Sequence, residues 1–97
     1  MVKLKTLLTE KKELDPKAIS YMKQLTARNN HTIARYNLAL QMKDKRLMKL
    51  YSSIIDIQDA YGSLPNGVSQ FRHSLEKDLF NQAKRMYSNY DEINKAF

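Results

Sequence analysis

Lysine and arginine side chains are the residues of this sequence whose type and spacing best suit a chemical role, the binding of phosphate. Four cations recur at intervals that place them on one face of a long helix, and Lys45 lies beside them. Their span is about 32 Å at the helical rise, close to one turn of duplex, where phosphates are dense and a helix fits the major groove. The predicted nucleic-acid-binding residues are Arg28, Arg35, Lys45, Arg46 and Lys49.

The distribution of charge supports this hypothesis. The formal net charge is +7, and residues 1–50 hold twelve Lys and Arg against four acids, whereas residues 51–97 hold five against six. Such cations often only keep a helix face solvated, and that interpretation stays open, but the scarcity of acids beside them favours an anionic partner. The hypothesis requires a straight helix. It fails if a corner at Asn29-Asn30 folds the arginines under carboxylates.

Catalysis has little support in the sequence. His31 and His73 are the only imidazoles, no cysteine is present, and no glycine-rich phosphate loop occurs. His73 is near Glu76 in the sequence, and Asp56 and Asp59 lie across the expected turn, but a metal needs three or four converging ligands. We therefore expect no enzyme activity, no cofactor, no metal site and no small-molecule substrate.

The fold expected to position these residues is all-α. Only 2 Gly and 2 Pro occur in 97 residues, too few turn signals for a sandwich or barrel. From Ile19 to Tyr61, apolar residues and tyrosines recur with a heptad period, with Ile33 and Leu40 at a positions and Tyr36 at a d position. This pattern predicts an antiparallel hairpin of two long helices with coiled-coil-like packing and a short N-terminal helix.

Local signals give the boundaries within a single domain over 1–97. Asp15-Pro16 is typical of a helix start, and Gly62 is typical of a helix end. Asn29 or Asn30 could cap a new helix, yet the heptad register is unchanged across them, so continuity there stays open. The predicted elements are a short helix over about 2–13, a long helix over about 16–61 that is continuous or broken near 29–31, a turn at 62–67 and a helix over about 68–96.

Several apolar residues lie off the expected seam between the long helices. They are either covered by the N-terminal helix or form a second contact surface for dimerisation or for another protein, as in four-helix arrangements built by self-association. The candidate protein interface consists of Leu38, Met42, Met48, Ile55, Phe80 and Tyr87.

Two functions follow from these features. The first is a non-catalytic, basic helical protein that binds nucleic acid. The alternative is an assembly subunit, adaptor or inhibitor that works by helix packing, as a homo-oligomer or within a larger assembly, for example as a phage or particle accessory protein. The sequence shows no signal peptide and no run of about 18 apolar residues. We therefore expect a cytoplasmic location, or one within a phage or other particle, and no membrane contact.

Overall fold

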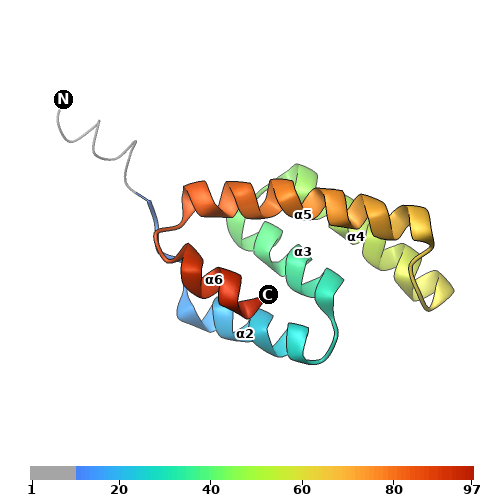
Figure 1. Ribbon diagram of the computed structural model, residues 1–97, viewed down its shortest axis with the longest axis horizontal. Coiled ribbons are helices and arrows are strands. Elements are labelled where there is room, and N and C mark those ends of the chain that lie inside the picture. The colour runs from blue at the N-terminus through green and yellow to red at the C-terminus, as the bar shows by residue number, and fades with distance from the viewer. Residues whose placement is uncertain (1–10) are drawn as a thin grey trace.

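The computed structural model describes residues 11–97, and this part of the chain contains five α-helices and no β-strand (Figure 1). The prediction of an all-α fold is confirmed. Two long helices packed as a coiled coil are not what the structure shows, because each predicted long helix is divided into shorter ones. The helices are α2 (Pro16–Ala27), α3 (His31–Met42), α4 (Lys45–Tyr61), α5 (Asn66–Met86) and α6 (Tyr90–Ala96).

The first predicted long helix is broken at two places. Asn29 adopts a left-handed conformation with φ of 63° and ends the first segment. Asn30 is the N-cap of α3, which begins at His31. Lys43 is also left-handed, with φ of 58°, and the Asp44 carboxylate caps α4 by accepting a hydrogen bond from the Leu47 amide at 3.0 Å. A continuous helix over 16–61 is therefore wrong, and α2, α3 and α4 fold back on one another.

The outer ends of this segment lie where local signals place them. Pro16 occupies the first position of α2, and the Asp15 carboxylate accepts a hydrogen bond from the Lys17 amide at 2.9 Å. At the other end, Gly62 has φ of 75°, a value that glycine adopts without steric cost, and α4 ends there. The chain then reverses into α5.

The second predicted long helix is broken after Met86. Tyr87 is extended and buried, and Asn89 binds both backbone groups of Leu14: its Oδ1 accepts from the Leu14 amide and its Nδ2 donates to the Leu14 carbonyl, each at 2.9 Å. Residues 11–15 form this non-helical strip beside the α5–α6 connection. The predicted N-terminal helix therefore does not include 11–13, and its remainder lies outside the described residues.

Packing places α3 at the centre. It contacts α2, α4 and α5, while α6 packs on α2 and α5 packs on α4. The far end of the α4–α5 hairpin extends beyond α2 and α3 (Figure 1). All five helices contribute to the largest fully buried side chains, which are Tyr51, Met22, Leu38, Leu47, Ile54, Leu79 and Ile93.

Candidate nucleic-acid interface

Arg35, a predicted phosphate ligand, lies inside the helical assembly. Its Nε is 2.8 Å from Glu76 Oε1 of α5, and its side chain is 13% exposed. It also donates to the His31 carbonyl at 2.9 Å and lies over the Phe97 ring, 5.7 Å from the centroid. Burial lowers the pKa of Arg35, and the Glu76 carboxylate opposes that effect. Arg35 thus holds helices together and is not placed to meet a phosphate.

A polar cluster that the sequence did not reveal surrounds this ion pair. Arg72 donates to the Thr32 hydroxyl at 2.9 Å, and that hydroxyl donates to Gln58 Oε1 at 3.3 Å, so the cluster connects α3, α4 and α5. The Tyr51 hydroxyl is buried and has no hydrogen-bond partner among the described residues, and burial raises the pKa of Tyr51. The residues of this polar cluster come from three separate helices, so the cluster can be recognised only from the tertiary fold.

The remaining arginines of the predicted stripe are separated from each other. Arg28 is exposed at the end of α2, before the first break. Arg46 forms an ion pair with Asp78 of α5, but its side chain stays 58% exposed. The Gln82 side chain donates to Asp78 at 3.0 Å, and this bond, together with Arg46, lowers the pKa of Asp78. The chain turns a corner at Asn29-Asn30, and Arg35 and Arg46 pair with carboxylates of α5, which is the outcome under which the predicted stripe fails. Nucleic-acid binding through a single straight stripe of cations is therefore wrong.

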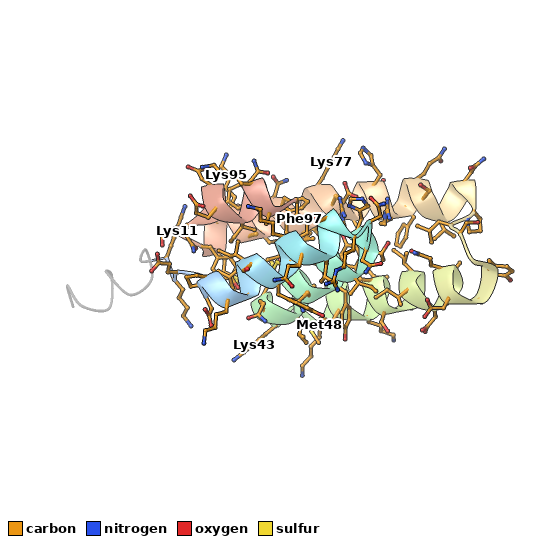
Figure 2. All side chains as sticks on the ribbon, turned by 90° about the horizontal axis from the view of Figure 1, so that it is seen from below. Lys11, Lys43, Met48, Lys77, Lys95 and Phe97 are labelled. Carbon is orange, nitrogen blue, oxygen red and sulfur yellow. The ribbon has the colours of Figure 1, made fainter. Side chains whose placement is uncertain are left out.

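Four cations nevertheless gather where α3 meets α4, and we call this group the positive corner: Lys43, Lys45, Arg46 and Lys49. All four are exposed, and no ion pair within residues 11–97 involves the three lysines. Figure 2 shows Lys43 pointing outward, on the opposite side of the molecule from Lys77. Lys45 and Arg46 lie in the first turn of α4, which contains no acidic residue. The amides of that turn give it a positive partial charge that adds to the side-chain charges, and the Asp44 carboxylate that caps the helix offsets part of this potential.

The predicted protein interface is divided by the structure. Leu38, Met42 and Tyr87 are 0%, 6% and 5% exposed, so they belong to the core of the chain itself and are corrected as contact residues. Phe80 is half-buried, and its ring packs edge to face on Phe97 with centroids 5.1 Å apart.

Met48 and Ile55 remain half-buried on α4. On α3 the burial is the reverse of the predicted seam, because Ile33 and Leu40 are 38% and 41% exposed while Leu38 is fully buried. Ile33, Leu40, Met48 and Ile55 therefore lie at least partly at the surface, where another chain could reach them.

Histidine and carboxylate side chains do not assemble a metal site in the described part of the chain. His73 Nδ1 lies 3.5 Å from Glu76 Oε2, but its side chain is 78% exposed. No three His, Asp or Glu side chains within residues 11–97 are placed to hold one ion. Across the same range, no helix has the length and apolar character needed to span a bilayer.

The chain matches no protein-family model, no curated protein and no solved structure. Its function must therefore be inferred from the surface itself.

Proposed function

We propose that this protein is non-catalytic and binds nucleic acid through the positive corner. The observation that supports the proposal is the placement of three lysines next to the N-terminus of α4, none of them in an ion pair with any residue of 11–97. The one carboxylate at this helix end, Asp44, accepts a hydrogen bond from the Leu47 amide and balances only part of their charge. Cations at this end of a helix oppose its dipole, so the arrangement costs stability. It gives in return a site of concentrated positive potential, which attracts phosphates and gains free energy by releasing their counterions.

The residue types suggest the kind of recognition. Lysine is a flexible point charge that meets phosphates without the paired geometry by which arginine recognises guanine. Arg46 is already engaged with Asp78. We therefore expect binding through the sugar-phosphate backbone, with little preference for base sequence.

Fluorescence anisotropy with a labelled duplex of about 20 base pairs, a matching single strand and an RNA of the same sequence would test the proposal. Affinity should fall as salt rises, with a log–log slope of about −2 to −4 if three or four phosphates are neutralised. The double variant Lys45→Glu/Lys49→Glu should weaken binding at least roughly tenfold.

The matched control is Lys77→Glu/Lys95→Glu, which makes the same change in net charge. Figure 2 shows Lys77 and Lys95 on the side of the molecule away from Lys43. Equal losses in the two double variants would mean that only net charge matters and would remove the positive corner as a site. Absence of binding to all three probes at low salt would remove nucleic-acid binding altogether.

A second candidate function, self-association, is favoured by the end of the α4–α5 hairpin. Tyr61 is 74% exposed and Phe71 is 46% exposed, and aromatic residues of this kind are common at protein interfaces. Light scattering of nuclease-treated protein over a concentration series should then show a dimer or larger species. The double variant Tyr61→Ser/Phe71→Ser should be monomeric; a wild-type monomer at all concentrations would exclude this candidate.

A further inference from the structure

The side of α4 that points away from the core carries an ordered set of charged and apolar residues. Leu47, Tyr51 and Ile54 are buried and mark the side of the helix that faces the core. Helical periodicity places a second set of residues together on the other side. We call this set the outer face of α4, and it consists of Lys45, Met48, Lys49, Ser52, Ile55, Asp56 and Asp59.

The outer face is open to another molecule. Within residues 11–97, α3 and α5 pack on α4, whereas α2 packs on α3 and α6. The two lysines and two aspartates of the face are exposed, and none of them forms an ion pair with any residue of 11–97. Met48 and Ile55 are half-buried at its edge, and Figure 2 shows Met48 on the side of the molecule away from Lys77.

The residues of this face are placed symmetrically about Ser52. Lys49 lies three residues before Ser52 and Asp56 lies four residues after it. Met48 and Ile55 lie four residues before and three residues after, and Lys45 and Asp59 lie seven residues to either side. Residues seven apart fall nearly on one line along a helix, so Met48 and Ile55 share one flank while Lys49 and Asp56 share the other.

Such symmetry makes the outer face complementary to itself. When two copies of a helix pack antiparallel about a two-fold axis, each residue before the axis meets the residue at the same distance after it, on the same flank. An axis at Ser52 brings Lys49 of each copy to Asp56 of the other. It also brings Met48 to Ile55, and Lys45 to Asp59. Opposite charges therefore meet one another, and apolar groups meet apolar groups.

Other arrangements of these charges are less favourable. Parallel pairing would place Lys49 against Lys49 and Asp56 against Asp56, and like charges across an interface oppose association. A nucleic acid that ran along the whole face would meet the two aspartates at its far end. Lys43 and Asp44, just before α4, carry opposite charges, so they add little net charge to either end of an antiparallel pair.

We propose that two copies of this protein associate through the outer face of α4, antiparallel about Ser52. Exposed ion pairs contribute little individually, so the charges mainly fix the orientation while the Met48–Ile55 contacts add apolar burial. The dimer should therefore be weak and should dissociate as salt rises. This surface is distinct from the hairpin tip with Tyr61 and Phe71.

Dimerisation through the outer face does not depend on nucleic-acid binding. Lys45 and Lys49 also belong to the positive corner, so a second copy and a nucleic acid would compete for them, and only this competition rests on the proposed function. Asp56→Lys/Asp59→Lys leaves the positive corner unchanged and should still bind the duplex. Dimerisation is measured on nuclease-treated protein, so its result is independent of whether the corner binds a duplex.

An exchange of charges tests the antiparallel pairing by analytical ultracentrifugation over a concentration series. Lys45→Glu/Lys49→Glu and Asp56→Lys/Asp59→Lys should each weaken dimerisation at least roughly tenfold, because like charges then meet. An equimolar mixture of the two variants should dimerise about as tightly as wild type, since each supplies the charges that the other lacks. Lys77→Glu/Lys95→Glu, which makes the same change in net charge as the first variant, should leave the dimer intact.

A pair of cysteine substitutions tests the position of the axis. The chain has no cysteine, and Ser52 and Ser53 are neighbours on α4. Two copies of Ser52 would face each other at the axis, close enough for a disulfide, whereas Ser53 points about a quarter turn away from the outer face. Under mild oxidation, Ser52→Cys should therefore form a linked dimer faster than Ser53→Cys.

Several results would overturn the inference. A wild-type monomer at all concentrations would exclude the dimer, and failure of the mixed variants to associate would exclude the charge pairing. Equal rates of linkage for Ser52→Cys and Ser53→Cys would remove Ser52 from the axis. Loss of the dimer in Tyr61→Ser/Phe71→Ser, with no effect of either charge reversal, would assign self-association to the hairpin tip instead.

Discussion

Arg35 Nε lies 2.8 Å from Glu76 Oε1, and this ion pair joins α3 to α5. Both side chains are poorly solvated, 13% and 18% exposed, so removing one charge leaves the other without its partner. We expect Glu76→Gln to lower the free energy of unfolding by about 2 kcal/mol, less than a fully buried pair would lose, because some solvent reaches the site. Urea denaturation followed by circular dichroism would measure the loss.

A double replacement is the control for this prediction. Arg35→Met/Glu76→Leu should destabilise the protein less than Glu76→Gln does, because neither charge is left behind. Arg35→Met should also change nucleic-acid affinity by less than about twofold, whereas Lys45→Met should weaken it. A similar loss of affinity in both single variants would contradict the structural role assigned to Arg35.

We expect the hydroxyl of Tyr51 to be dispensable for folding. Its side chain is 0% exposed, and no described residue hydrogen-bonds to the oxygen. Tyr51→Phe removes a buried polar group while retaining the ring, so the melting temperature should stay the same or rise by a few degrees, roughly the effect of up to 1 kcal/mol. A clear fall in the melting temperature would reveal a partner such as a buried water.

Tyr51→Phe should also change how the stability of the protein depends on pH in alkaline solution. Burial raises the pKa of Tyr51, so the folded protein keeps a proton that the unfolded chain loses above about pH 10. The stability contributed by this group is present below that pH and is lost as the pH rises further. Thermal melts at neutral pH and at about pH 11 should therefore show wild type losing more stability than Tyr51→Phe.

Asp78 should make the stability of the protein depend on pH in acid solution. The hydrogen bond from Gln82 and the charge of Arg46 lower its pKa, so its contribution to stability is present above the ordinary carboxyl value of about 3.9 and is lost as the pH falls below it. Because the site is solvated, the contribution is about 1 kcal/mol or less. Wild type should exceed Asp78→Asn in stability at neutral pH, and the gap should close by about pH 2. Asp56→Asn is the control for loss of charge alone; a gap that persists in acid would exclude the ionic explanation.

Lys43 is held in a left-handed conformation that costs a residue with a β-carbon about 1 kcal/mol. Lys43→Gly should therefore raise the free energy of unfolding by about 0.5–1 kcal/mol, measured by urea denaturation. Lys43→Ala removes the same charge without relieving the backbone, so it should give no such gain. Equal effects of the two substitutions would mean that the charge, and not the backbone, controls stability at this corner.

The helix boundaries that the sequence indicates are those decided by the residues at the boundary themselves. Asp15 caps α2 and Gly62 supplies a positive φ, and neither role depends on distant contacts. The break at Lys43 has no such signal, because lysine rarely adopts a positive φ. An unchanged heptad register across both breaks also gives the false impression of one helix, since each short helix is amphipathic and the turns happen to preserve the period.

The candidate site was predictable only in part, because burial depends on tertiary contacts. The lysines of the positive corner are exposed and form no ion pair with residues 11–97, as a cluster of cations with few acids suggests. Arg35 is withdrawn because Glu76 and Phe97, both distant in the sequence, reach it through the fold. The buried face of α3 differs from the predicted one for the same reason. Leu38 packs against the neighbouring helices, whereas Leu40, which was predicted to lie in the seam, is exposed.

The two hydrogen bonds between the Asn89 side chain and the Leu14 backbone limit the order in which this fold can be completed during synthesis. Thr26 likewise donates to the Ala96 carbonyl at 2.8 Å, and the Arg35 guanidinium lies over the ring of Phe97. Closing such long loops has an entropic cost that only the finished contacts offset. While the ribosome is still translating the segment before Asn89, α2 and α3 lack these contacts. The complete set of these contacts can form only after Phe97 has been translated, so the packing of α2 and α3 against the C-terminal residues is a late step of folding during synthesis.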